Sequence, residues 1–162
     1  MKNLRILLCA LGMLALSLGA VACGDDDEGS TAADEATTED AGTVTVTATD
    51  DIEADEYSFD LSATPTADTK EVTFQNDGES PHELIFVRIN EGFTVDDAIK
   101  AEGEEGTATP VGFTFAKPGE EAKPIEVKKP LEPGPYVMLC TVETKDKVPH
   151  FELGQLEEFD IE

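Results

Sequence analysis

Basic residues are scarce in this chain of 162 residues. Lys and Arg together number 11 against 36 Asp and Glu, which gives a formal net charge of −25 at pH 7. A charge of this sign repels a phosphate backbone and provides no counterion release on binding. The composition therefore excludes nucleic acid as a default partner. The length allows one ordinary domain with accessory segments.

Cysteine and histidine are rarer still. The chain has three cysteines, Cys9, Cys23 and Cys140, and two histidines, His82 and His150. A disulfide framework is excluded by so few thiols. The sequence also lacks a glycine-rich phosphate loop, a paired-carboxylate motif and a serine nucleophile elbow. A Cys140–His150 nucleophile pair would need a third orienting group, which the sequence does not show. The chain is therefore not predicted to be an enzyme.

One long apolar run is present, close to the first residue. Lys2 and Arg5 precede an uncharged run over residues 6–22, which ends in small residues before Cys23. This pattern is typical of a secretory signal peptide over residues 1–22. A permanent membrane span is the alternative, because the run reaches the lower edge of the roughly 17–25 residues that a spanning helix needs.

The end of this run resembles the lipobox of bacterial lipoproteins. The residues are Ala20-Val21-Ala22-Cys23, with Ala20 where Leu is more usual. The resemblance implies cleavage before Cys23, lipidation of Cys23 and an extracytoplasmic protein that its N-terminal lipid anchors to the bacterial cell membrane. Simple secretion with cleavage nearby is the alternative. Residues 24–42 contain eight acids, no base and no large apolar side chain, so segment 23–42 is predicted to be the lipidated cysteine and a disordered acidic tether.

Residues 43–162 are predicted to form one all-β domain. Apolar residues alternate with polar ones in most of the candidate strands, which are centred on residues 44–48, 57–61, 72–74, 84–89, 111–115, 125–127, 136–140 and 159–161. The apolar run at 84–89 predicts a central strand buried on both faces. Thr94, followed three residues later by Asp97, predicts the N-cap of a short inserted helix. About eight short strands with Pro and Gly turns favour a β-sandwich.

The rare reactive side chains lie at a strand end and in loops. Cys140 ends the predicted strand that begins at Gly134, and His150 follows in a charged loop broken by Pro149. A thiolate and two imidazoles, completed by a weak fourth donor, form the set of ligands that type 1 copper uses. The spacing therefore indicates a candidate metal site.

Three segments resemble the cupredoxins, the family of type 1 blue copper proteins. Asn76-Asp-Gly-Glu-Ser-Pro-His82 is similar to the segment that supplies the first histidine, and Gly134-x-Tyr136-x-x-x-Cys140 is similar to the cysteine strand. Four residues separate His150 from Gln155, as they separate the histidine from the axial ligand in plastocyanin and stellacyanin. The resemblance covers about residues 43–162. It implies a Greek-key β-sandwich with one copper ion, equatorial ligands His82, Cys140 and His150, and an axial ligand Gln155.

One spacing departs from the family. Nine residues separate Cys140 from His150, where well-known cupredoxins have two to four. The longer loop adds only roughly 1 kcal/mol of closure free energy. Its tip carries charged residues, including Glu143 and Lys147, so we expect it to be solvated and to weaken the preorganisation of the site.

Each candidate ligand has a simpler interpretation. Cys140 could be a small buried hydrophobe, and His82 and His150 could be hydrogen-bonded rings without a metal. Gln155 is the weakest assignment, because a glutamine in a turn needs no special role. Met138 is predicted to lie in the core and not to bind a metal.

The resemblance implies one-electron transfer, with His150 as the exit route for the electron and a redox protein as partner. Two alternatives stay open: a metal-free binding or structural module, and a protein of copper storage or delivery. The acidic surface could attract a basic partner, but we favour a general role in solubility. A monomer is expected.

Overall fold

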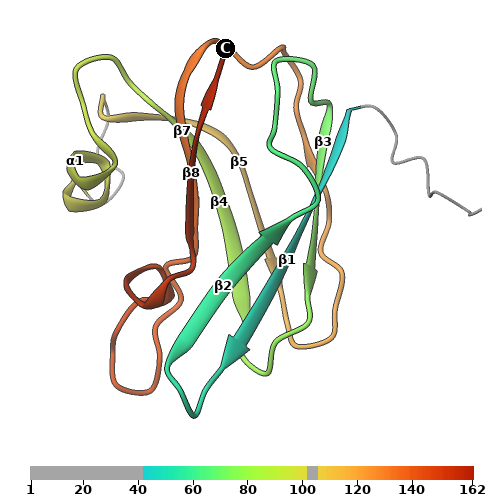
Figure 1. The fold of residues 1–162 in the computed structure, drawn as a ribbon, viewed down its shortest axis with the longest axis vertical. Helices are drawn as coiled ribbons and strands as arrows, with labels where there is room; N and C mark the ends of the chain where they lie inside the picture. The colour runs from blue at the N-terminus through green and yellow to red at the C-terminus, as the bar shows by residue number, and fades with distance from the viewer. Residues whose placement is uncertain (1–41, 102–105) are drawn as a thin grey trace, which may run out of the picture. The chain divides into compact units, whose positions relative to one another are not determined.

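The computed structural model describes residues 42–101 and 106–162. In these residues eight strands form two four-stranded sheets that face each other (Figure 1). The predicted signal peptide, Cys23 and the acidic tether up to residue 41 lie outside the described residues. Within the described ranges, no helix is long and apolar enough to cross a membrane.

The first sheet has the order β2-β1-β3-β6. Its strands are β1 (Thr43–Asp51), β2 (Glu56–Leu61), β3 (Glu71–Asn76) and β6 (Ile125–Glu126). Strand β1 pairs with β2 in antiparallel and with β3 in parallel orientation. Their apolar residues alternate with polar ones, so one face of this sheet is buried and the other is solvated.

The second sheet has the order β5-β4-β7-β8, and all its pairings are antiparallel. Its strands are β4 (His82–Ile89), β5 (Ala108–Ala116), β7 (Gly134–Leu139) and β8 (Leu156–Ile161). The predicted central position of β4 is confirmed. The predicted burial of both its faces is only partly right: Leu84 and Phe86 are fully buried, whereas Ile85 and Val87 are half-buried beside the helix.

The core lies between the two sheets. Phe74 of the first sheet and Leu84, Phe86 and Met138 of the second have no exposed surface. Burial of a large apolar side chain contributes roughly 1.5–3 kcal/mol relative to exposure, so this layer supplies the main stabilisation. Met138 lies in this layer, as predicted.

The predicted inserted helix is also confirmed as α1 (Val95–Lys100). Thr94 Oγ1 accepts a hydrogen bond from the Asp97 amide at 3.1 Å, and the Asp97 carboxylate accepts one from the Thr94 amide at 2.9 Å. This reciprocal pair is a capping box. The all-β sandwich with one short helix, predicted from the sequence, is therefore the observed architecture.

Strand β5 exposes aromatic residues that its alternating pattern would place in a core. Phe113 and Phe115 are 60% and 46% exposed, whereas Thr114 and Ala116 face inward. Phe86 pairs with Gly112 and Val87 with Pro110, so Val111 is an extra residue that forms a bulge. A bulge changes which residues of a strand face the core.

Candidate metal centre

The four predicted site residues meet at the end of the sandwich where β4 and β8 begin and β7 ends, which is the lower end of these strands in Figure 1. His82 opens β4, Cys140 follows directly after β7, and His150 opens the short 3₁₀ helix η1 (His150–Leu153). Gln155 lies between η1 and β8. All four side chains are buried, with His150 exposed by 1% and the others by 0%.

The donor atoms face one another. The Nδ1 atoms of His82 and His150 lie 3.2 Å apart, and the Cys140 Sγ lies 3.6 Å from His150 Nδ1. The ligand atoms of the three residues all lie within 4.8 Å of one another. Nitrogen and sulfur donors lie at about 2.0–2.3 Å from a bound transition-metal ion, so donors of one ion are separated by about 3–4 Å. The cluster therefore fits a single metal ion.

Gln155 completes the group. Its Oε1 lies 2.9 Å from His82 Nδ1, while its Nε2 donates a hydrogen bond to the Ser58 carbonyl at 3.1 Å. The contact with Ser58 fixes the orientation of the amide, so the oxygen and not the nitrogen faces the imidazoles. The structure thus brings Gln155 to the cluster, and its role as an axial ligand stays a prediction.

The long loop after Cys140 folds back on itself. The Thr144 amide donates to the Val148 carbonyl and the His150 amide to the Val142 carbonyl, both at 2.9 Å. The Phe151 amide then donates to the Cys140 carbonyl at 3.0 Å. These bonds return the chain to its starting point, so the nine intervening residues do not hold His150 away from Cys140.

The sulfur of Cys140 has a backbone donor. The Glu83 amide lies 3.4 Å from Sγ, and the carboxylate of Glu83 accepts hydrogen bonds from both the amide and the hydroxyl of Thr141. The residue after His82 is thereby tied to the residue after Cys140. Around a metal centre, contacts of this kind hold the ligands in position and tune the ion.

Burial determines the protonation of the metal-free cluster. It raises the pKa of the Cys140 thiol to about 11 and lowers the pKa of His150 to about 4, with the nearby His82 adding to the second shift. Burial also lowers the pKa of His82, although Asp50 opposes this. Both imidazoles are therefore neutral at pH 7 and have lone pairs for a metal, whereas the thiol must lose its proton on binding.

Two further residues contact the histidines and were not singled out from the sequence as site residues. The Tyr57 ring stacks on His150 with ring centroids 4.1 Å apart, and the Asp50 carboxylate lies 3.6 Å from His82 Nε2. The sequence pattern predicted Tyr57 only as a core position in a strand, and nothing in the sequence distinguished Asp50. The two are partners across β1 and β2, a register that the sequence does not fix.

The stack with Tyr57 changes the expectation for electron exit. His150 is 1% exposed and Tyr57 is 5% exposed, so the imidazole has no free edge at the surface. A path through His150 would have to continue through Tyr57 or the backbone of the surrounding loops.

Neither a protein-family model nor a curated protein matches the chain. Among solved structures, it is similar to dithionite-reduced auracyanin from the photosynthetic bacterium Roseiflexus castenholzii, with 24% identity, 73% of this chain and 96% of that chain covered, and a TM-score of 0.45. It is also similar to auracyanin A from Chloroflexus aurantiacus, described as a blue copper protein, with 18% identity, coverage of 75% and 100%, and a TM-score of 0.45. In its two-sheet sandwich and in the His–Cys–His group at one end of it, the chain resembles the cupredoxins, as the sequence predicted.

Proposed function

We propose that this chain binds one copper ion in a type 1 site and transfers single electrons. One observation carries the proposal: both histidines of the sequence and Cys140, its one thiol within the described residues, converge in a buried cluster. Separate structural roles for these three side chains would not require their donor atoms to meet.

The donor set matches copper and disfavours magnesium and calcium. Two imidazoles, one thiolate and a weak oxygen donor match the trigonal site with a weak axial group that proteins use for copper electron transfer. Magnesium and calcium prefer oxygen donors, which the cluster supplies only through Gln155. When bound, copper would supply the one-electron redox couple.

The residues of the chain would divide the remaining work. His82 and His150 offer neutral nitrogens, and Cys140 offers a sulfur that already accepts the amide of Glu83. Gln155 offers an oxygen, a harder donor than a thioether, which favours Cu(II) and a lower potential. The burial of all four side chains keeps water from the ion, which suits electron transfer better than hydrolysis.

We further propose that the protein acts outside the cytoplasm, anchored to the cell membrane by lipid on Cys23, and exchanges electrons with a redox protein. The support is the signal pattern of residues 1–22 and the lipobox-like segment that ends at Cys23. Incorporation of labelled fatty acid into the wild type but not into Cys23→Ala would support the anchor. Equal labelling of both would contradict it.

Titration with Cu(II), followed by visible absorption and electron paramagnetic resonance, tests the copper site. We expect one equivalent of copper, an intense thiolate-to-copper band, and loss of that band in Cys140→Ala. Met138→Leu is the matched control, because it removes a fully buried sulfur outside the cluster and should keep the band.

Other outcomes would identify the alternatives. Survival of the band in Cys140→Ala would reject the assignment of the ligands. Tightly bound copper that cycles slowly or not at all between its redox states would favour storage or delivery. Absence of tight binding, with no thermal stabilisation by Cu(II), would favour a metal-free module.

A further inference from the structure

A buried carboxylate lies behind His82, on the side away from the other ligands. Asp50 is the next-to-last residue of β1, and its side chain has no exposed surface. Its Oδ2 lies 3.6 Å from His82 Nε2. Within the described residues this nitrogen is buried and has no hydrogen-bond partner. An unpaired buried donor or acceptor costs free energy, so the position of the carboxylate needs an explanation.

The carboxylate is held in place independently of the ring. Asp50 Oδ1 accepts a hydrogen bond from the Glu79 amide at 2.6 Å, and Oδ2 accepts one from the Ser80 amide at 3.0 Å. Both amides belong to the turn that leads into His82. The two bonds fix the carboxylate as an acceptor beside the ring of His82.

Gly78 leaves the space between this carboxylate and the ring open. A Cβ atom at Gly78 would lie 2.4 Å from Asp50 Oδ1 and 2.9 Å from His82 Nε2, closer than side-chain atoms approach one another. The Gly78 amide donates to the Asn76 side chain at 2.9 Å, which fixes the turn in this position. Any larger residue would push the carboxylate and the imidazole apart.

Metal binding would place a proton on His82 Nε2, and the Asp50 carboxylate could then accept a hydrogen bond from it. In the metal-free cluster the Nδ1 of His82 faces the acceptor Oε1 of Gln155 at 2.9 Å, which stabilises a proton on Nδ1. An ion on Nδ1 displaces that proton, and the neutral ring then carries its proton on Nε2. Asp50 is the acceptor that faces this atom. Its oxygen has to approach by roughly 0.7 Å to reach an ordinary hydrogen-bond distance.

We propose that Asp50 is a positioning residue of the copper site, which accepts the Nε2 proton of metal-bound His82 and fixes the orientation and tautomer of that ring. This inference needs one part of the proposed function, namely that His82 binds a metal through Nδ1. A carboxylate on the far nitrogen also makes the imidazole a stronger donor, which stabilises the more highly charged Cu(II) ion.

Asp50→Asn tests the proposal, with Asp51→Asn as the matched control. The control removes the same charge from the neighbouring residue, whose exposed carboxylate accepts only the Glu53 and Ala54 amides in its own turn. We expect Asp50→Asn to weaken the binding of Cu(II) and of Zn(II) about 10- to 100-fold and to raise the copper reduction potential. Asp51→Asn should change neither affinity by more than about twofold.

A spectroscopic readout separates positioning from a merely structural role. In the Zn(II) form, which is diamagnetic, the His82 Nε2 proton should be visible by NMR, exchange slowly with solvent, and shift or disappear in Asp50→Asn. Equal affinities, potentials and proton signals in Asp50→Asn and Asp51→Asn would overturn the proposal. If Asp50→Asn does not fold, Gly78→Ala is the second variant, and a normal Nε2 proton signal and affinity there would equally overturn it.

The two proposals fail in different ways. Zinc binding with the protected Nε2 proton, but without a blue copper band, would reject the proposed function and leave the role of Asp50 intact. A blue copper site that does not respond to Asp50→Asn would reject the role of Asp50 alone.

Discussion

At the scale of single residues, Gln155 is held by contacts on both sides of its amide. Its nitrogen donates to the Ser58 carbonyl, and its oxygen lies 2.9 Å from His82 Nδ1. Gln155→Met would replace that oxygen by a softer thioether, which favours Cu(I). We therefore expect the reduction potential of the copper form to rise, as measured by redox titration of the visible band. An unchanged potential would show that the side chain is not an axial ligand.

The metal-free cluster predicts a dependence of stability on pH. Burial lowers the pKa of His150 in the folded state from 6.5 to about 4, so the unfolded chain takes up a proton first as the pH falls. The contribution of this group to stability is therefore complete above about pH 6.5 and decreases between pH 6.5 and 4. Urea midpoints measured in the presence of a chelator should fall in this range.

The control for this dependence is His150→Gln, which has no proton to take up. Its urea midpoint should fall less steeply between pH 6.5 and 4 than that of the wild type. Equal slopes in the two proteins would mean that other groups, such as carboxylates, cause the whole decrease.

The sequence singled out the four candidate ligands but not the residues that contact them. His82, Cys140, His150 and Gln155 could be predicted because rare residue types recur at a known spacing, and the structure brings all four together. Asp50 could not be predicted, because Asp is abundant here and its proximity to His82 depends on how β1 meets the turn before β4. One carboxylate among 36 acidic residues carries no signal by itself.

At the scale of elements, the end of η1 carries a strict conformational requirement. Gly154 ends this 3₁₀ helix with φ of +110°, and a Cβ there would lie 2.8 Å from the Tyr57 carbonyl oxygen. Gly154→Ala should therefore strain the segment that places His150 and Gln155. We expect a loss of about 1–3 kcal/mol in the free energy of unfolding, and weaker metal binding, by chemical denaturation and copper titration.

Gly119 provides the matched control for this turn. It also has a positive φ, +73°, but no atom lies within 4 Å of a Cβ built there. Gly119→Ala should thus show only the cost of the left-handed backbone and leave copper binding unchanged. If Gly154→Ala lowers the free energy of unfolding no more than Gly119→Ala does, the close approach to the Tyr57 carbonyl has no effect on stability.

Elements with a regular pattern were predictable, and those with an irregular register were not. The capping residues at Thr94 and Asp97 located α1, and alternation located β1 to β3. In β5 the alternation marks a strand, but the extra residue Val111 changes which side chains face inward. A bulge depends on the partner strand, so local sequence did not predict that Phe113 and Phe115 would be exposed.

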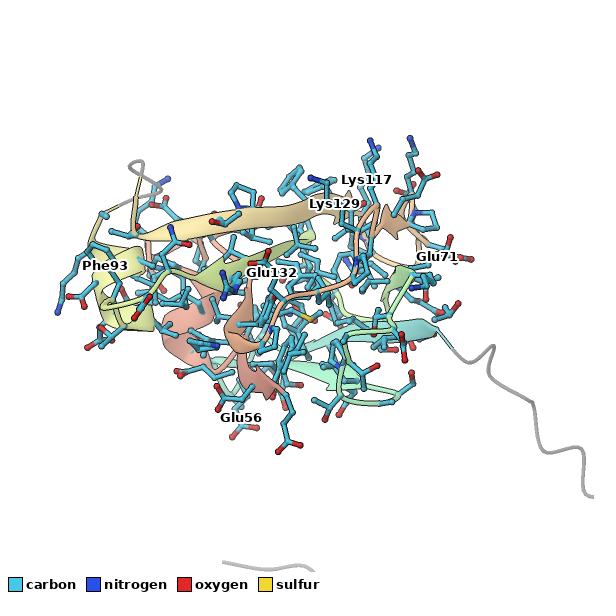
Figure 2. All side chains as sticks on the ribbon, turned by 90° about the horizontal axis from the view of Figure 1, so that it is seen from above. Glu56, Glu71, Phe93, Lys117, Lys129 and Glu132 are labelled. Carbon is cyan, nitrogen blue, oxygen red and sulfur yellow. The ribbon has the colours of Figure 1, made fainter. Side chains whose placement is uncertain are left out.

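At the scale of the whole molecule, acidic charge dominates the surface. Glu56, Glu71 and Glu132 project outward from different parts of the domain, while Lys117 and Lys129 are among the few basic side chains (Figure 2). With a formal charge of −25, the protein repels anions over distances of about one Debye length, which is about 10 Å at 0.1 M salt.

This charge predicts opposite salt effects for two kinds of small oxidant. The copper(I) form should react more slowly with ferricyanide as salt is lowered, and faster with a cationic cobalt complex. Stopped-flow rates at ionic strengths between about 0.01 and 1 M, where the Debye length falls from about 30 to 3 Å, measure both trends. The same trend for both oxidants would show that the site is reached through a surface without net negative potential.

The convergence of the candidate ligands also bears on the order in which the chain would fold and bind a metal. His82 and His150 are 68 positions apart in the sequence, and His82 and Gln155 are 73 apart, whereas Cys140 and His150 are only ten positions apart. An unfolded chain would therefore offer a metal ion a local thiol–imidazole pair long before His82 could reach it. If the chain binds copper as proposed, an ion that meets the unfolded chain finds only this thiol–imidazole pair, and the complete set of donors exists only after the sandwich has closed.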